Sequence, residues 1–200
     1  MRHEPSALVN RLLGVVEQDI APLTRAGVKK GNKIFGAAIL LKSDLSLVLA
    51  GTNNEIENPL WHGEMHTLKL LYEQIPNTER PAPADCIFFS THEPCTLCLS
   101  AITWAGYDNF TYLFSHEDSR DSFNIPHDLR ILKEVFTLDP GGYNKSNVYW
   151  KSRSVGDLVA QCDEDDRALF AERLARIETA YAELSEIYQA SKGTNEIPLN

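Results

Sequence analysis

The first apolar pattern along the chain has the period of a helix. Apolar residues recur on one face of it at Leu8, Leu12, Val16 and Ile20. This spacing predicts an amphipathic helix from Ser6 to about Leu23. Pro22 should kink or end that helix, because proline lacks the N–H donor and its ring crowds the preceding turn.

Apolar runs typical of β-strands come next. The segments KIFGAAILL (33–41) and LSLVLAG (45–51) are separated by three polar residues, which predicts a β-hairpin. The runs CIFFS (86–90) and FTYLF (110–114) predict two further strands, and residues 147–150 predict a short one. Helical spacing predicts helices near residues 62–75, 95–104 and 127–136. Helices that alternate with strands in this way indicate an α/β fold.

The last long element begins after an acidic first turn at residues 163–166, which suits the positive end of a helix dipole. An apolar seam follows at Phe170, Leu174, Ile177, Tyr181, Leu184 and Tyr188. The seam lasts fewer than three heptads, so packing on the chain's own domain is favoured over a coiled coil, although the seam is also a reason to expect a homodimer. We predict a main domain over residues 1–160 and a helical extension over residues 161–200, packed on the same domain.

Composition limits the classes of function. The 200 residues, 43% of them hydrophobic, suffice for one globular domain. The formal charge of -9 argues against broad nucleic-acid binding, which depends on Lys and Arg displacing counterions. No run approaches about 18 apolar residues, so no membrane span is predicted. Four cations near an expected helix end are interpreted as a solvated turn: Arg25, Lys29, Lys30 and Lys33.

The chain has four cysteines, at Cys86, Cys95, Cys98 and Cys162. They are too few for a disulfide framework in a chain of this length, which favours a reducing compartment and a metal-binding or catalytic use. We therefore expect a cytoplasmic protein. Cys86 and Cys162 are expected to be buried small apolar residues.

The stretch STHEPCTLCLSA (90–101) places Cys95 and Cys98 at the start of a helix, behind a proline. The stretch WHGEMH, upstream, places His62 at the start of another helix. Zinc takes imidazole nitrogen and thiolate sulfur, and a catalytic zinc uses three protein ligands and a water. His62, Cys95 and Cys98 make such a set, so we predict a bound Zn²⁺.

Glu64 lies two residues after the histidine of this set. A carboxylate beside a zinc-bound water can accept its proton and later deliver protons to a ring nitrogen and a leaving group. H-x-E followed by P-C-x-x-C is the signature of zinc nucleobase deaminases, and both halves are intact here. The pattern predicts hydrolytic deamination, in which zinc-bound hydroxide attacks the amino-bearing ring carbon and ammonia is released.

Three other interpretations fit part of the pattern. A metalloprotease would have its glutamate directly after the first histidine, where this chain has Gly63. A thioredoxin-like use of the two cysteines would leave His62 and Glu64 without a role. A closed structural zinc site stays open as an alternative, with His66 as the fourth ligand and no catalysis.

The chain resembles the cytidine deaminase-like superfamily, most closely the branch of fungal cytosine deaminase, bacterial guanine deaminase and the tRNA adenosine deaminases. The matching segments are FGAAIL from residue 35, GTNN from 51, HGE from 62 and EPCTLCLSAITWAG from 93. The resemblance implies a three-layer α/β/α fold with a mixed sheet of about five strands. It also implies zinc between the two motif-bearing helices, a homodimer, a place in purine or pyrimidine metabolism, and an added C-terminal helix.

The same resemblance implies which residues contact the substrate. In relatives an asparagine just after the second strand does so, which here is Asn53 or Asn54, and the backbone N–H of Gly63 would meet a substrate carbonyl. Glu93 would support the zinc loop. The loop at 115–124 is a candidate lid, with a solvated charged turn as the alternative. The net charge favours a small nucleobase or nucleoside substrate, with a tRNA adenosine deaminase-like editing enzyme as the alternative.

Overall fold

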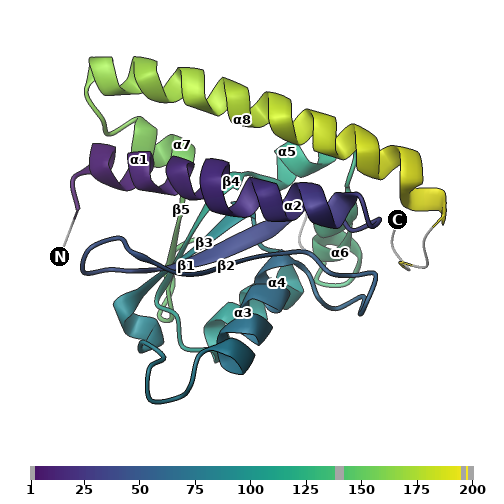
Figure 1. Cartoon of the computed structure of the whole chain (residues 1–200), viewed down its shortest axis with the longest axis horizontal. Coiled ribbons are helices and arrows are strands. Elements are labelled where there is room, and N and C mark those ends of the chain that lie inside the picture. Colours follow the sequence, from purple (N-terminus) through teal and green to yellow (C-terminus); the bar gives the residue numbers. More distant parts are fainter. Residues whose placement is uncertain (1–2, 138–141, 195–196, 198–200) are drawn as a thin grey trace.

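A five-stranded mixed sheet forms the centre of the structure (Figure 1). The computed structural model describes residues 3–137, 142–194 and 197. The strands are β1 (Gly36–Leu41), β2 (Leu47–Thr52), β3 (Cys86–His92), β4 (Asn109–Phe114) and β5 (Lys151–Ser154), in the order β2-β1-β3-β4-β5. β1 runs antiparallel to β2 and β3, whereas β3, β4 and β5 are parallel. The predicted mixed sheet is confirmed.

Helices cover both faces of this sheet (Figure 1). One face carries α1 (Pro5–Val15), α2 (Ala21–Val28), α7 (Val155–Val159) and α8 (Glu164–Ser191), and the other carries α3 (Gly63–Gln74) and α4 (Thr96–Trp104). The shorter helices α5 (His116–Asp121) and α6 (His127–Glu134) follow β4, and 3₁₀ turns occupy Pro83–Asp85 and Lys192–Thr194. The three-layer α/β/α architecture predicted from the sequence is confirmed.

The central strands supply side chains to two hydrophobic cores. In β1, Ala38 and Leu40 belong to the core that includes α1 and α8, while Ala37 and Ile39 belong to the core under α3 and α4. Successive side chains of a strand point to opposite faces, so a sheet that is covered on both faces requires a continuous apolar run. This explains why residues 34–41 contain no polar side chain.

The N-terminal helical segment runs past Leu23, where the predicted helix ends, and an irregularity lies next to Pro22, where a kink or an end was predicted. A π-helical segment, Val16–Ile20, lies just before this proline, and the helical path continues through α2 to Val28. Proline crowds the turn before it and donates no hydrogen bond, and the wider π turn accommodates this misfit. The helix is therefore irregular and longer than expected.

The strand predicted at residues 147–150 is also misplaced. β5 begins at Lys151, which pairs with Asn109 of β4. The side chain of Asn147 instead accepts hydrogen bonds from the backbone N–H groups of Tyr149 and Trp150, at 2.9 and 3.2 Å. This local capping holds residues 147–150 in a turn, because an asparagine side chain competes with the sheet for backbone donors.

α8 packs along the rest of the same chain. Most of its predicted seam is buried, and it joins the core that contains α1: Phe170, Ile177, Tyr181, Leu184 and Tyr188. Arg173 also binds Glu17, with hydrogen bonds of 3.1 and 2.8 Å. The seam is thus already covered, and it does not support the expected homodimer. The domain boundary at residue 160 stays a prediction, and residues 195, 196 and 198–200 of the extension lie outside the described residues.

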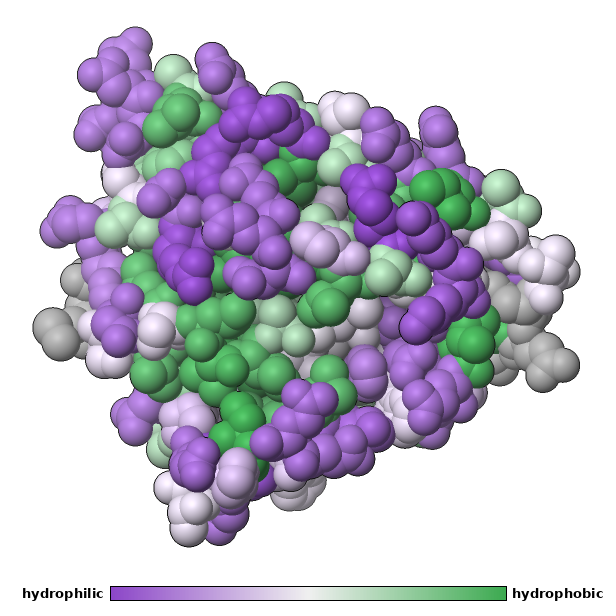
Figure 2. Space-filling model, viewed as in Figure 1, coloured by the Kyte–Doolittle hydropathy of each residue, from purple (hydrophilic) through white to green (hydrophobic). Residues whose placement is uncertain are grey.

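The surface is hydrophilic over the helices and apolar at one edge of the sheet. Figure 2 shows purple residues over α8 and α1, and a green area below them, where Figure 1 places β2. β2 is an edge strand, and its Leu47, Val48 and Leu49 are only half-buried. Among the residues that the structure describes, no helix combines the length and the apolar character that crossing a membrane requires.

Candidate active site

The N-termini of α3 and α4 hold the predicted zinc ligands. His62 is the N-cap of α3, Cys95 is the N-cap of α4, and Cys98 lies in the first turn of α4. Gly63 allows α3 to start close against β1, since a Cβ at this position would lie 2.8 Å from backbone atoms of Phe35. Such a contact is too short for a side-chain carbon. The glycine therefore determines where the histidine is placed.

The three ligand atoms are spaced as zinc requires. Cys95 Sγ lies 3.4 Å from His62 Nδ1 and 3.7 Å from Cys98 Sγ, and Cys98 Sγ lies 3.8 Å from the same Nδ1. A tetrahedral zinc with bonds of about 2.3 Å to sulfur and about 2.0 Å to nitrogen separates two sulfurs by about 3.8 Å, and sulfur from nitrogen by about 3.5 Å. The trio, whose ligand atoms all lie within 4.8 Å of one another, therefore fits zinc, with Nδ1 as the imidazole ligand.

The two thiols have different electrostatic surroundings. The hydrogen bond between Cys95 and Cys98 lowers the pKa of Cys95 well below its usual range, and the neighbouring His62 has the same effect. Burial raises the pKa of the Cys98 thiol. The helix N-terminus that carries both residues favours the thiolate form, which is the form that binds zinc. The site therefore has one ready anionic ligand and a second that a metal cation would deprotonate.

Glu64 lies beside the trio, in the first turn of α3. Its carboxylate Oε2 accepts a hydrogen bond from the Cys98 thiol at 3.4 Å, and the side chain is buried. Burial, reinforced by the negative charge of Cys95, raises the pKa of the Glu64 carboxyl to about 7. A carboxyl group in this range can both accept and return a proton near neutral pH.

A cavity of about 390 Å³ opens onto this cluster. His62, Glu64 and Cys95 form one part of its wall, and Lys33 and Glu55 form another. Much of the remaining wall is apolar and includes Phe35, Leu60, Leu97, Ile125 and Ile131. An apolar cavity of this size with a few charged groups is typical of a small-molecule site.

Lys33 and Glu55 are functional-site residues that sequence reasoning missed. The interpretation of Lys33 as part of a solvated turn is wrong, because its Nζ lies 3.0 Å from Glu55 Oε1 and the two side chains are only 6% and 3% exposed. Lys29 and Lys30, by contrast, are exposed. The one available signal was position, since Lys33 directly precedes an apolar strand whereas the other cations of the group do not.

The predicted substrate-binding residues lie around this cavity but are not part of its described wall. Asn53 is buried, donates to Glu55 Oε2 at 2.6 Å and accepts from the Glu55 N–H at 3.1 Å. Asn54 donates to Glu57 at 2.7 Å and faces the surface. Gly63 packs against β1. Direct contact of any of the three with a substrate stays a prediction.

The alternative of a closed structural zinc site is contradicted by the position of His66. Its Nδ1 lies 2.7 Å from the backbone oxygen of Thr52, and its ring stacks on Trp61 with 5.8 Å between centroids. His66 is therefore held away from the zinc trio. A histidine at i+4 follows the helix surface, and here the helix turns that position toward β2.

The expectation of a lid at residues 115–124 is also wrong, because these residues are not among those that border the cavity. Ser115 and Asp118 form a capping box that starts α5, and Phe123 is buried in the core beside Phe114. The cavity is instead bordered by residues just beyond this segment, among them His127 and Asp128 of α6. Acceptor-rich residues in this loop cap a helix, which sequence composition does not distinguish from a lid.

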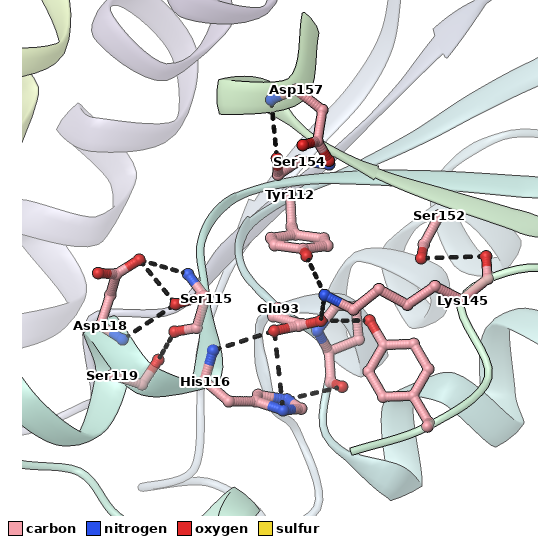
Figure 3. A network of polar contacts seen from close by, with 12 residues as sticks. Glu93, Tyr112, Ser115, His116, Asp118, Ser119, Lys145, Ser152, Ser154 and Asp157 are labelled. Atoms are coloured by element: carbon pink, nitrogen blue, oxygen red, sulfur yellow. Dashed lines mark hydrogen bonds and ion pairs between the residues drawn. The ribbon is translucent and has the colours of Figure 1, made fainter.

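Glu93, directly before Pro94 and Cys95, is the centre of a polar network (Figure 3). Its Oε1 accepts a hydrogen bond of 2.5 Å from the Tyr143 hydroxyl and lies 3.2 Å from Lys145 Nζ, while its Oε2 accepts from the His116 backbone N–H at 3.0 Å. The network joins the zinc loop to α5 and to the segment before β5. This agrees with the structural support expected of Glu93.

Comparison with known proteins identifies the family. Residues 16–114 match the model of the cytidine and deoxycytidylate deaminase zinc-binding region. The chain belongs to the cytidine deaminase-like superfamily of zinc-dependent enzymes. The matched segment contains His62, Glu64, Cys95 and Cys98, whereas α8 and the segment of Tyr143 lie beyond it.

Similar proteins include guanine deaminases. The guanine deaminase of Bacillus subtilis (strain 168) is 29% identical over 90 residues, which are 44% of this chain and 54% of that protein. The chain thus spans about half the length of this curated relative. A solved guanine deaminase from Bacillus subtilis aligns with 25% identity and a TM-score of 0.46, over 74% of this chain and 88% of that one. One from Nitrosomonas europaea aligns with 19% identity and a TM-score of 0.44, over 78% and 81%.

The purified protein should contain about one zinc per chain. Cys95→Ser and Cys98→Ser should each lose most of this metal, because a hydroxyl is a poor replacement for a thiolate. Cys162→Ser, which alters a buried thiol in the other core, should keep it. Metal analysis by mass spectrometry after desalting measures the content. Full zinc in both site variants would refute the ligand assignment.

Removal of the Tyr143 hydroxyl should loosen the zinc loop. Tyr143→Phe keeps the ring but leaves the buried Glu93 carboxylate with one donor fewer. We expect zinc to be released to a chelator about 10-fold faster, as is typical when a group that orients a metal site is lost. Tyr149→Phe is the matched control, because Tyr149 is exposed in the same segment. Equal release rates for the two variants would argue against a positioning role.

Proposed function

We propose that this chain is a hydrolytic deaminase of a free nucleobase or nucleoside, with Glu64 as the proton shuttle. The observation that carries the proposal is the position of Glu64, whose carboxylate lies 3.4 Å from Cys98 Sγ. This contact puts a proton acceptor beside the three residues that would hold zinc, and a zinc held by three protein ligands would supply an activated water there. A structural zinc site would not require a buried carboxylate at that position.

The residues of the site suit each step of the reaction. Zinc, when bound, supplies an activated water by lowering the pKa of that water. Glu64 accepts one proton as the water oxygen bonds to the amino-bearing ring carbon, and it passes this proton to the adjacent ring nitrogen. It then accepts the second proton from the same oxygen and passes it to the departing amine. One water is consumed, the C–N bond breaks, a C=O bond forms, and ammonia leaves.

The wall of the cavity suits a flat heterocycle. Leu97 and Ile131 are among the apolar side chains of the wall, and they can contact the faces of a ring. Lys33, Glu55 and Glu64 are among its charged side chains. A cavity of about 390 Å³ accommodates a base or a nucleoside, and the excess of acidic over basic residues in the chain disfavours a phosphorylated substrate.

Glu64→Gln should abolish most of the activity and keep the metal. The amide has nearly the shape of the carboxyl but accepts no proton from water, so we expect kcat to fall by ~10²–10⁴-fold or more. Ammonia release is measured with cytosine, cytidine, guanine, guanosine and adenine, and zinc content is measured in parallel. Glu73→Gln, on the exposed side of the same helix, is the control. Undiminished turnover in Glu64→Gln would reject the mechanism, and an inactive wild type would reject the function.

We also propose that the protein is a cytoplasmic homodimer. The family resemblance supports the dimer, and so does the apolar area at the edge strand β2 (Figure 2), since an exposed strand edge is prone to pair with another chain. The four cysteines are free thiols, which suits the cytoplasm. Sedimentation equilibrium at micromolar concentration measures the oligomeric state, and a single species of 22.5 kDa would contradict the dimer.

A further inference from the structure

The ion pair of Lys33 and Glu55 lies in the cavity wall but outside the zinc trio. Both side chains are almost fully buried, with 3.0 Å between Nζ and Oε1. Burial of two charges costs desolvation energy that their attraction rarely exceeds, so apolar residues would serve the fold equally well. A buried pair that faces a ligand cavity therefore suggests a role in binding.

The pair is held rigidly by its neighbours. Asn32, next to Lys33, accepts a hydrogen bond of 2.9 Å from the backbone N–H of Ile56. On the other side, Asn53 binds both the carboxylate and the backbone N–H of Glu55. These bonds join the segment before β1 to the segment after β2, so the charged groups are fixed before any ligand arrives.

The pair also lies close to the reacting centre. Glu55 Oε1, which accepts the hydrogen bond from Lys33, is 3.7 Å from His62 Nε2. This nitrogen is on the far side of the imidazole from the two sulfurs, which lie near Nδ1. The ammonium and the zinc-binding imidazole thus approach the same carboxylate atom. A ring placed with its reacting carbon at the metal would have another edge near Lys33.

The Lys33 ammonium has unused donors. An ammonium group carries three N–H donors, and within the described ranges 3–137, 142–194 and 197 its hydrogen bond goes to Glu55. The remaining donors favour an oxygen acceptor. A neutral acceptor is preferred to an anion, because Glu55 already balances the charge of Lys33 and Glu64 adds a carboxylate to the same cavity.

We propose that Lys33 binds a ring carbonyl oxygen of the substrate, so that the enzyme deaminates bases with both an oxo and an amino group, such as guanine or cytosine, and discriminates against adenine. The inference rests on the proposed deaminase function. Adenine offers no carbonyl, so its binding would leave the Lys33 donors unsatisfied in a buried site, and loss of such bonds is a strong source of specificity. Glu55 then acts as the positioning residue that aims the ammonium.

Lys33→Met tests this proposal, because methionine is similar in length and has no donor. We expect KM for the preferred oxo base to rise about 10-fold or more, the usual effect of losing a hydrogen bond to a charged group, with a smaller change in kcat. Lys33→Arg should restore part of the affinity. Lys30→Met, which removes an exposed charge three residues away, is the matched control and should leave KM unchanged.

Two further measurements make every outcome informative. The double variant Lys33→Met with Glu55→Gln removes both charges, so a loss of folding caused by an unpaired Glu55 is avoided. Calorimetric binding of the same bases to zinc-loaded protein carrying Glu64→Gln reports affinity without turnover. An unchanged KM and binding constant without Lys33, or equal use of adenine by the wild type, would overturn the role of Lys33 and leave the deaminase function intact. Absence of both turnover and binding for every base would overturn both.

Discussion

The close approach of two helix N-termini is the constraint on which the rest of the site depends. α3 starts directly against the beginning of β1 because Gly63 has no side chain, and α4 starts where β3 ends. This contact sets His62 Nδ1 within 3.8 Å of both sulfurs, the spacing of a tetrahedral metal. A backbone shift of one ångström would separate the ligands beyond that geometry. The sheet is therefore the rigid base that the metal site requires.

Three buried glutamates line the cavity, and they differ in the groups that compensate their negative charge. Glu55 forms an ion pair with Lys33. Glu93 accepts hydrogen bonds from the Tyr143 hydroxyl and the His116 backbone N–H, and it forms an ion pair with Lys145. The ion pairs found among the described residues do not include Glu64. Two of the carboxylates are thus paired with cations and donors, and the third is left to exchange protons. The position of a glutamate in the sequence does not show whether it is paired or free to exchange protons. The groups that surround it in the structure do.

The parts that the sequence predicted were those encoded by short-range patterns. The H-x-E and P-C-x-x-C motifs located the metal trio because each motif opens a helix, and helix starts next to strand ends are close in an α/β fold. The four longer strands and the buried seam of α8 followed from periodicity in the same way. Lys33 and Glu55 are 22 residues apart, and only the antiparallel pairing of β1 with β2 brings them together. The end of the N-terminal helix and the segment at residues 115–124 were misjudged because local signals were overridden, by a π turn in one case and by a helix cap in the other.

The metal site receives support from residues that follow its ligands by 45 positions or more in the sequence. Tyr181 of α8 packs its ring 5.6 Å from that of His92, and Tyr143 binds Glu93, so residues far along the chain flank the short run that leads to Cys95. A ribosome synthesises all of the zinc ligands before it makes either tyrosine. The nascent chain therefore carries its ligands for a time without these supports. Synthesis of Tyr181, rather than appearance of the ligands, marks the point at which both of these contacts can form.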